Sequence, residues 1–304
     1  MTIHLGVKSD PIENRYSFDW LFGIMADFRV DRLQMGSSFS TFVVDEGWFT
    51  RLRTAGEKKG IRISSVFTSH REMGGYGSGD PSLEASARMG WERIIHVASL
   101  LGAESAGSSA GIVLRDQPQS RSRGLECFFT HMKELMRVAR RQGLRAITVE
   151  PMSSVWEYPS TPEQVREMTA IFDSTHAAAP SETVPVYFCG DISHGVADER
   201  ERVIHDNWMM FELEIPWMWE FHFKNTDSIF NSTFGFGRDE QLHGIVDLRK
   251  IKSLLEKNAG RFPAHDVIGY LELPGPKLGR DYSDGLLRGQ LEESLSALRE
   301  VFPE

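Results

Sequence analysis

The sequence predicts an α/β fold, a single (β/α)₈ (TIM) barrel domain that spans residues 1–304. Short apolar runs alternate with longer amphipathic segments along the whole chain, and eight such units of about 38 residues fill the 304 residues, which is the size and rhythm of this fold. A doubly wound open sheet with the same alternation usually carries a glycine-rich phosphate loop after its first strand. Here the first expected strand is followed by Lys8-Ser9-Asp10-Pro11, which contains no glycine. The barrel is therefore the preferred interpretation.

In the first half of the chain we expect helices at residues 18–28, 46–59, 82–101 and 125–142, and strands at residues 3–7, 33–36, 61–68 and 105–111. Residues 61–68 alternate in polarity and are rich in β-branched side chains, which indicates a strand. Residues 82–101 repeat apolar side chains at three- and four-residue spacing, which indicates a helix. Gly60, Gly102 and Gly143 follow three of these helices and are typical helix stops. Residues 105–111 have poor strand propensity, and a strand is expected there only because the alternation requires one.

In the second half we expect strands at residues 144–149, 185–189, 219–223 and 267–273, and helices at 161–175, 199–211, 248–257 and 286–301. The helix at 161–175 has the clearest start, because Thr161 can cap it and Pro162 suits its first turn. A side chain that can bind a metal ion stands at the end of each of these four strands. The chemistry of the molecule is therefore expected in this half of the chain.

Composition limits the partners that the protein can have. The net charge is −9, which argues against a general nucleic-acid-binding surface. Cys127 and Cys189 are the two cysteines, and such low usage is typical of a reducing compartment. The sequence shows no signal peptide and no apolar stretch near the ~18 residues that cross a bilayer. We expect a cytoplasmic protein with a small-molecule partner. The tryptophans and methionines at 208–219 are expected in the core, with a homo-oligomer interface as the alternative.

Four ligand-type side chains stand at the carboxyl ends of four successive expected strands. They are Glu150, Asp191, His222 and Glu272. In a (β/α)₈ barrel these strand ends meet at one face, where the active site forms. Three carboxylates converging there would repel one another and take up protons, whereas a divalent cation removes that cost. An oxygen-rich set with one imidazole suits Mn²⁺, Mg²⁺, Co²⁺ or Zn²⁺.

Each of the four residues also has a structural interpretation. Glu150 could be a capping or loop carboxylate before its proline, Asp191 could form an Asx turn, and His222 could be a hydrogen-bonded core histidine. Glu272 is the hardest to explain in this way, because a buried carboxylate without a partner is unfavourable. Cys189 lies two residues before Asp191 and competes with it as a ligand, but its deeper place in the strand favours Asp191. One shared site accounts for all four residues together.

The motifs around these residues resemble the signatures of the xylose-isomerase-like barrel superfamily. The motifs are Glu150-Pro151, Asp191-x-x-His194, His222-x-Lys224-x-x-Asp227 and Leu271-Glu272. The resemblance spans most of the chain and is strongest over residues 144–275. The superfamily includes ketose 3-epimerases such as the D-tagatose type, sugar-phosphate isomerases and epimerases, hydroxypyruvate isomerases and the endonuclease-IV class. The resemblance implies a metal-dependent epimerase or isomerase that acts on a small ketose or ketose phosphate.

The resemblance also implies roles for the four ligands. The glutamates that match Glu150 and Glu272 bind the metal and also shuttle a proton on opposite faces of the substrate, while Asp191 and His222 complete the metal site. One glutamate would remove the proton α to a carbonyl that the metal polarises. Return of a proton from the opposite carboxylate would invert that carbon, whereas return at the neighbouring carbon would move the carbonyl.

Five further residues are expected to contact the substrate. The resemblance implies that His194 contacts substrate oxygens and that Glu157 is the nearest match to a glutamate that orients the substrate. Arg71 follows the third expected strand, and Lys277 and Arg280 follow the eighth. A phosphate commonly binds near the loops after strands seven and eight of this fold, so these cations could hold a phosphorylated substrate. The alternative is that they are solvated loop charges.

The chain departs from the ketose epimerase pattern after the seventh expected strand. No arginine follows His222 over residues 223–228, and the usual lysine-aspartate pair is Lys224-Asn225. The Arg-Glu-Met-Gly-Gly loop at 71–75 and the Glu-Leu-Pro-Gly-Pro-Lys segment at 272–277 look most like the branch that acts on four-carbon sugar phosphates. That branch includes tetrulose-4-phosphate epimerases (racemases) of erythritol catabolism. A tetrulose phosphate epimerase or racemase is therefore the most specific expectation.

Three other functions remain open on the same barrel. An endonuclease-IV-like metal phosphodiesterase would need more histidines for a three-metal cluster and a basic DNA-binding face, and the acidic charge balance speaks against it. A lyase subunit that deglycosylates C-glycosides would have a stable partner subunit. A barrel that only binds a metal or a sugar would not exchange substrate protons with heavy water.

Overall fold

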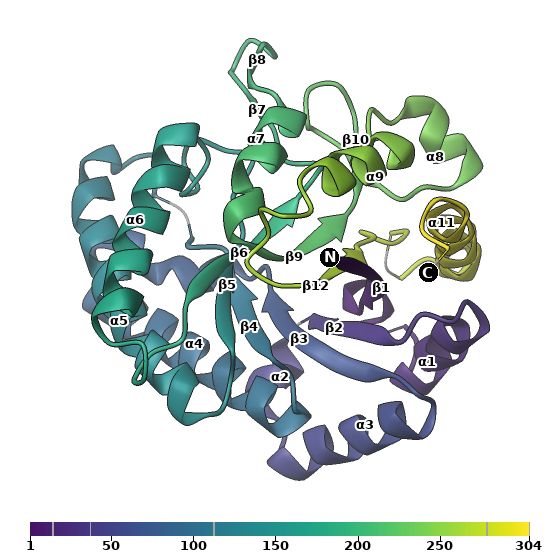
Figure 1. Cartoon of the computed structure of the whole chain (residues 1–304), viewed down its shortest axis with the longest axis horizontal. Coiled ribbons are helices and arrows are strands. Elements are labelled where there is room, and N and C mark those ends of the chain that lie inside the picture. Colours follow the sequence, from purple (N-terminus) through teal and green to yellow (C-terminus); the bar gives the residue numbers. More distant parts are fainter. Residues whose placement is uncertain (14, 37, 112, 278, 304) are drawn as a thin grey trace. The chain divides into compact units, whose positions relative to one another are not determined.

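The computed structural model describes residues 1–13, 15–36, 38–111, 113–277 and 279–303, except for the side chains of residues 71 and 72. Eight strands form a closed parallel barrel in the order β1-β12-β9-β6-β5-β4-β3-β2 (Figure 1). They are β1 (Thr2–Lys8), β2 (Arg32–Gly36), β3 (Arg62–Thr68), β4 (Ser105–Ser108), β5 (Ala146–Val149), β6 (Val186–Asp191), β9 (Met218–Phe223) and β12 (Asp266–Leu271). The predicted fold class is confirmed.

Helices connect the strands, as the sequence predicts. The α-helices are α1 (Phe18–Asp27), α2 (Phe39–Val43), α3 (Glu46–Lys58), α4 (Pro81–Leu101), α5 (Arg121–Arg141), α6 (Pro162–Ala178), α7 (Asn207–Glu214), α8 (Arg238–His243), α9 (Leu248–Lys257), α10 (Asp281–Asp284) and α11 (Leu287–Val301). Single turns of 3-10 helix are η1 (Asp10–Ile12), η3 (Pro118–Ser120) and η4 (Ile215–Trp217), and η2 (Arg71–Ser78) is longer. Two small hairpins pair β7 (Val196–Ala197) with β8 (Val203–His205) and β10 (Asn225–Thr226) with β11 (Thr233–Phe234). The short helices α2, α8 and α10 were not expected from the sequence.

The contacts within the chain divide it into two compact units. Unit 1 consists of Met1–Gly36, Arg51–Ile63 and Gly190–Glu304, and unit 2 consists of Ser37–Thr50 and Ser64–Cys189. The expectation that residues 1–304 form one domain stays a prediction.

In unit 1, strand β1 lies between β2 and β12, and β12 pairs with β9 in parallel. Alternate residues of β9 point to opposite faces. Phe221 and Phe223 point to the outer face, where their rings contact Phe211 of α7 at a centroid distance of 5.6 Å and Phe302 at 5.2 Å. His222 lies between them in the sequence and therefore points to the inner face. The aromatic packing of β9 thus fixes the direction of His222.

In unit 2, the strands β3, β4, β5 and β6 pair in parallel in that order. Strand β4 is buried along its whole length and is shorter than the expected 105–111. A Cβ atom on Gly107 would lie 2.1 Å from Thr148 Oγ1 and 2.7 Å from Phe67 Cδ2. Close neighbours on both sides therefore require small side chains in β4, and this explains the poor strand propensity of its sequence.

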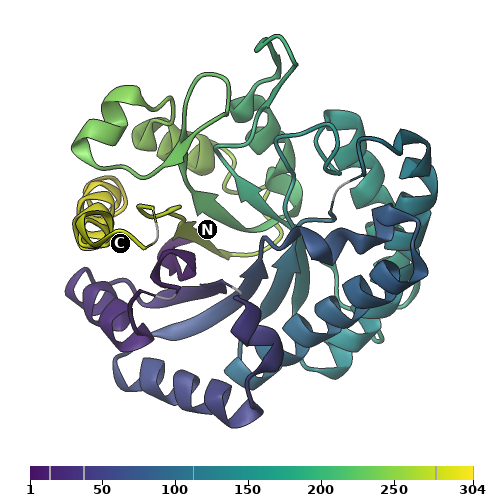
Figure 2. The same ribbon diagram turned by 180° about the vertical axis from the view of Figure 1, so that it is seen from behind.

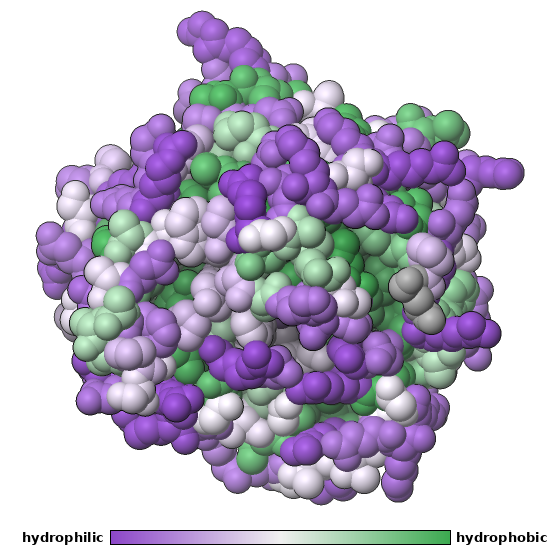
Figure 3. Space-filling view, in the orientation of Figure 1, coloured by the Kyte–Doolittle hydropathy of each residue, from purple (hydrophilic) through white to green (hydrophobic). Residues whose placement is uncertain are grey.

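The expected helix at 199–211 is wrong over its first half. Residues 196–205 form the β7–β8 hairpin, whose tip is the hydrophilic projection at the top of Figure 3. The Asp198 side chain accepts hydrogen bonds from the backbone of Arg200 and Arg202, which makes a turn in place of a helix. Helix α7 begins only after Asp206, whose carboxylate caps the backbone N–H of Trp208 and Met209.

The helix boundary signals are confirmed elsewhere. Thr161 caps α6 through a hydrogen bond from the backbone N–H of Gln164, and Gly102 ends α4 in the left-handed conformation that a side chain disfavours. Over the described residues, no helix combines the length and apolar character needed to cross a membrane.

The aromatic layer of unit 1 predicts a large stability effect. Replacing Phe221 by alanine leaves a cavity against Phe211 and Phe223, and we expect it to lower the free energy of unfolding by about 3–5 kcal/mol in a urea titration. The control is Phe39→Ala, because Phe39 is 77% exposed and its loss should change stability by no more than about 0.5 kcal/mol. Equal effects of the two substitutions would contradict the assigned packing.

Candidate functional site

Three of the expected ligands lie together in unit 1. Asp191 ends β6, His222 lies in β9, and Glu272 directly follows β12. Each offers one ligand atom, and these atoms lie within 4.8 Å of one another. His222 Nδ1 is 3.0 Å from Glu272 Oε2 and 3.8 Å from Asp191 Oδ2. We call these three residues the acidic cluster.

Asp191 uses its two carboxylate oxygens differently. Oδ1 accepts a hydrogen bond of 2.8 Å from the backbone N–H of Ser193, which is the Asx turn considered above. Oδ2 points into the acidic cluster and lies 3.4 Å from His194 Nε2. Burial alone would raise the pKa of Asp191. Nearby positive charge, chiefly on His194 and Lys224, outweighs this effect and holds the pKa of Asp191 below its usual range. The turn therefore orients the carboxylate so that Oδ2 faces the acidic cluster.

His222 is fully buried and is oriented by a residue of β2. Its Nε2 lies 2.8 Å from Oε1 of Gln34. A proton on Nε2 can be donated to this oxygen, and we assign the tautomer on that ground. Nδ1 then carries a lone pair that faces the carboxylates of Asp191 and Glu272. Such an arrangement is unfavourable unless a positively charged species lies between these groups.

Two lysines supply positive charge to Glu272. Lys8 of β1 places Nζ 2.8 Å from Glu272 Oε1, and Lys224 places Nζ 3.1 Å from Glu272 Oε2 and 3.0 Å from Asp191 Oδ2. Burial alone would raise the pKa of Glu272, but Lys224 and Lys8 outweigh burial and hold it well below its usual range. Both carboxylates of the acidic cluster are therefore ionised at neutral pH.

Sequence reasoning did not assign site roles to Lys8, Asp10 or Gln34. Lys8 is completely buried and also lies 3.0 Å from Asp10 Oδ2. Lys8 and Gln34 are register partners on β1 and β2, so both lie at the same level as the acidic cluster. A long polar side chain at the carboxyl end of a short apolar strand is the sequence feature that indicates Lys8 and Gln34. The sequence places Lys224 in a motif but does not predict its two ion pairs.

Glu150 and Glu157 belong to unit 2, and both are buried. Glu150 directly follows β5, and its backbone N–H donates to Ser108 O at the end of β4. Glu157 lies in the loop that follows, and its backbone N–H donates to Ser154 O. Both residues therefore follow a strand at its carboxyl end, as the sequence predicts.

The remaining expected residues lie in loops or deeper in a strand. Lys277 and Arg280 follow β12 and are exposed. The side chain of Arg71 lies outside the described part of the chain. Cys189 is completely buried within β6, whereas Asp191 reaches the acidic cluster.

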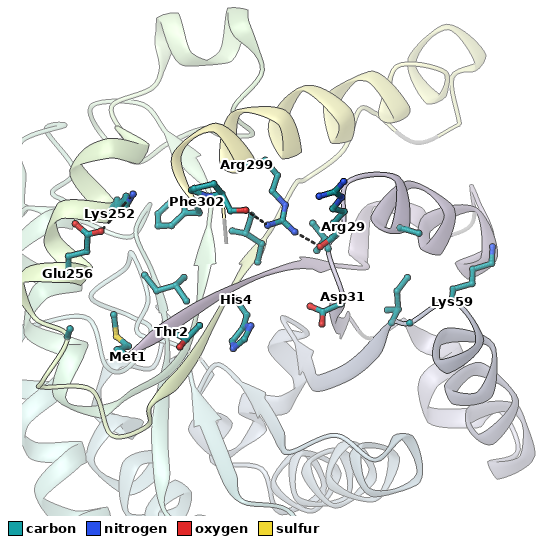
Figure 4. Close-up of a pocket in the computed structure, with 18 residues that line it drawn as sticks. Met1, Thr2, His4, Arg29, Asp31, Lys59, Lys252, Glu256, Arg299 and Phe302 are labelled. Atoms are coloured by element: carbon teal, nitrogen blue, oxygen red, sulfur yellow. Dashed lines mark hydrogen bonds and ion pairs between the residues drawn. The ribbon is translucent and has the colours of Figure 1, made fainter.

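An open cavity of about 860 Å³ also lies in unit 1, at the opposite end of β1 from Lys8 (Figure 4). Met1, Thr2 and Phe302 line it, so both ends of the chain contribute. Arg299 of α11 donates a hydrogen bond of 2.9 Å to Phe28 O at the end of α1 and another to Arg29 O, and these two helices lie side by side in Figures 1 and 2. Strand β1 is roughly 20 Å long at about 3.3 Å per residue, so this cavity is separate from the acidic cluster.

Comparison with solved structures finds the same fold in several sugar-converting enzymes. An inferred xylose isomerase from Rhodospirillum rubrum superimposes with a TM-score of 0.76 at 19% identity, over 98% of this chain and 99% of that one. D-psicose 3-epimerase from Clostridium cellulolyticum, solved with D-tagatose, gives 0.72 at 14% identity, over 98% and 99%. The 3-keto-D-glucoside 4-epimerase of E. coli gives 0.62 at 13% identity, over 98% and 100%. At these identities the likeness concerns the fold.

Sequence comparison gives the family. No curated protein matches the chain by sequence. The profile of the xylose isomerase-like TIM barrel family matches residues 28–277, which is most of the chain and includes all four expected ligands. The chain therefore belongs to the xylose isomerase-like TIM barrel family.

Proposed function

We propose that this protein is a metal-dependent epimerase or isomerase that acts on a small ketose or ketose phosphate. The observation that carries the proposal is the acidic cluster, in which two ionised carboxylates and an imidazole lone pair share one small buried space. The similar folds of ketose 3-epimerases and a keto-glucoside 4-epimerase support the same class of reaction.

The acidic cluster fits a divalent metal ion. Two carboxylates and one imidazole are ligands that Mn²⁺, Mg²⁺, Co²⁺ and Zn²⁺ accept. The hydrogen bond from His222 Nε2 to Gln34 is the outer contact that usually orients a histidine ligand. Lys224 Nζ bridges Asp191 and Glu272, so a cation already balances the charge at this place. We propose that Asp191, His222 and Glu272 would hold the ion and that Lys224 would contact the substrate.

Glu150 is proposed as the fourth ligand. Strand β5 pairs with β6, and Val149 is the register partner of Phe188. Glu150 is the next residue of β5, and Asp191 lies three residues beyond Phe188 on β6. In a (β/α)₈ barrel the carboxyl ends of neighbouring strands carry the active-site groups. Glu150 therefore follows the strand next to the one that carries Asp191.

The proton chemistry is assigned to Glu150 and Glu272. A bound divalent ion would polarise the substrate carbonyl and increase the acidity of the neighbouring C–H group. Glu272 is proposed to accept this proton, and Lys8 holds its Oε1 in place. Glu150 would return a proton from the opposite face, which inverts the carbon. Return of the proton at the neighbouring carbon gives isomerisation.

The substrate is proposed to be a short ketose phosphate, with a four-carbon tetrulose phosphate as the most specific candidate. His194 and Glu157 are proposed to contact its oxygens and to orient it. Arg71, Lys277 and Arg280 are proposed to hold its phosphate, and the last two follow β12, where this fold often binds a phosphate. The solved structures with a similar fold are named for different sugars. They therefore support the class of reaction and do not point to one particular substrate.

The proton-transfer proposal predicts the effect of two isosteric substitutions. Glu150→Gln and Glu272→Gln should each slow deuterium incorporation from heavy water into the substrate by about 10²- to 10⁴-fold, because each removes an acid-base group. NMR can follow exchange in tetrulose, pentulose and hexulose phosphates with Mn²⁺, Mg²⁺, Co²⁺ or Zn²⁺ present. Glu163→Gln, a change of an exposed carboxylate on α6, is the control. Undiminished exchange in both site variants would rule the assignment out.

The orienting role of Gln34 predicts a change in metal affinity. Gln34→Leu removes the acceptor for His222 Nε2, and we expect metal affinity in a calorimetric Mn²⁺ titration to fall about 10- to 100-fold. The control is Gln119→Leu at an exposed position. Equal Mn²⁺ affinities in the Gln34 variant and the wild type would show that this hydrogen bond does not orient a ligand.

The phosphate proposal predicts a selective loss of substrate affinity. Lys277→Ala and Arg280→Ala should raise KM for the phosphorylated ketose about tenfold or more, because a hydrogen bond to a charged group contributes about 1.5–3 kcal/mol. KM for the unphosphorylated sugar should stay the same. A parallel rise for both sugars would show that these cations do not bind the phosphate.

A further inference from the structure

A second group of metal-ligating side chains lies in unit 2. Glu84 is in the first turns of α4, and Cys127 and His131 are on α5, which packs beside α4 (Figure 1). Their ligand atoms lie within 4.8 Å of one another. The family resemblance assigns no role to these residues, and none of them belongs to the acidic cluster.

Hydrogen bonds and ring stacking hold the three side chains in place. Glu84 Oε1 lies 3.0 Å from His131 Nε2, and the Cys127 thiol also hydrogen-bonds to the Glu84 carboxylate. The Tyr76 ring of η2 stacks on the His131 ring with centroids 5.1 Å apart. Arg88 donates a hydrogen bond of 3.2 Å to His131 O. The ligand atoms therefore face one another on a packed surface of η2, α4 and α5.

The spacing on α5 suits a metal ion. Residues four apart on a helix point to the same side, so Cys127 and His131 can bind one ion together, and Glu84 reaches it from α4. Thiolate, imidazole and carboxylate are the three ligand types that Zn²⁺ takes, and water can fill the fourth tetrahedral position. The side chains of Glu84 and His131 are 33% and 26% exposed, so an ion can enter from solvent.

An activated nucleophile does not explain the cluster. A reactive thiol needs positive surroundings, and here the hydrogen-bonding partner of the Cys127 thiol is the Glu84 carboxylate, which is an anion. The same carboxylate and thiol suit a divalent cation, because a thiolate, a carboxylate and Zn²⁺ sum to zero charge. The positive charge of nearby Arg123 would repel such an ion.

We propose that Glu84, Cys127 and His131 form a zinc site that ties α4 to α5 and is independent of the acidic cluster. On binding, the Cys127 thiol loses its proton to solvent and the thiolate forms the Zn–S bond. In the complex, His131 carries its proton on Nδ1 and binds through Nε2. Glu84 releases its two hydrogen bonds and binds through one oxygen.

Co²⁺ is the probe that separates the two sites, because a thiolate ligand produces a charge-transfer band in the near ultraviolet and oxygen and nitrogen ligands do not. We expect this band in the wild type, in Cys189→Ser and in Glu272→Gln, and its loss in Cys127→Ser. Glu84→Gln and His131→Ala should weaken Co²⁺ binding at this site at least tenfold. Glu126→Gln, an exposed change on the same helix, should leave the band unchanged. The absence of a band in the wild type, or its survival in Cys127→Ser, would overturn the proposal.

A thiol-protection experiment keeps the test decisive if Cys127→Ser folds poorly. In the Cys189→Ser protein, Cys127 is the only thiol, and the intact cluster remains. Zn²⁺ should slow its alkylation at least tenfold, and a chelator should restore the rate. An alkylation rate that Zn²⁺ leaves unchanged would refute the site. Epimerase activity is measured separately, so failure of this site and failure of the proposed function give different results.

Discussion

The charge of Asp191 and Glu272 must be balanced within a buried space, and the rest of the candidate site is arranged around that constraint. Two like charges about 4 Å apart repel by about 4 kcal/mol at an effective dielectric constant of about 20. Protonation would relieve this repulsion, but His194 and Lys224 hold the pKa of Asp191 low, and Lys224 and Lys8 hold the pKa of Glu272 low, so both groups stay ionised. The site therefore keeps two carboxylates as ligands and bases at neutral pH. Lys8 contacts Oε1 of Glu272. Lys224 contacts both Oε2 of Glu272 and Oδ2 of Asp191, which face the His222 imidazole.

The strand arrangement of unit 1 delivers these groups from distant parts of the sequence. Gln34 and Lys8 are register partners on β2 and β1, and β1 pairs with β12, which leads into Glu272. His222 comes from β9 on the other side of β12, with Phe221 and Phe223 packed on the outer face. Each polar group is thus held by a strand whose other face is fixed by apolar packing. Such a frame reduces the movement of the ligands, and preorganised ligands lose less entropy when an ion binds.

The site residues that can be predicted from the sequence are those at the carboxyl ends of strands in the second half of the chain. Asp191, His222 and Glu272 could be found because each lies at the carboxyl end of a recognisable strand, and a mostly buried carboxylate such as Glu272 requires a partner. Lys8 could not be assigned in the same way, because a lysine after an apolar strand is usually at the surface. Its role depends on contact with Glu272, which is 264 residues away. The prediction of a helix at 199–211 is wrong over its first half for a different reason. The turn made by Asp198 competes locally with helix formation.

Both candidate metal clusters bring a carboxylate against an imidazole. Their other donor atoms differ, so the two clusters differ in the ions that they suit. In each cluster a carboxylate oxygen contacts an imidazole nitrogen at 3.0 Å. The acidic cluster adds a second carboxylate, which makes an oxygen-rich donor set that suits Mn²⁺, Mg²⁺, Co²⁺ or Zn²⁺. The cluster on α4 and α5 adds a thiol, which favours Zn²⁺ over Mn²⁺ or Mg²⁺. Because the donor sets differ, one ion cannot satisfy both clusters equally well. Under the two proposals, the thiol would therefore make the cluster on α4 and α5 more selective for Zn²⁺ than the acidic cluster.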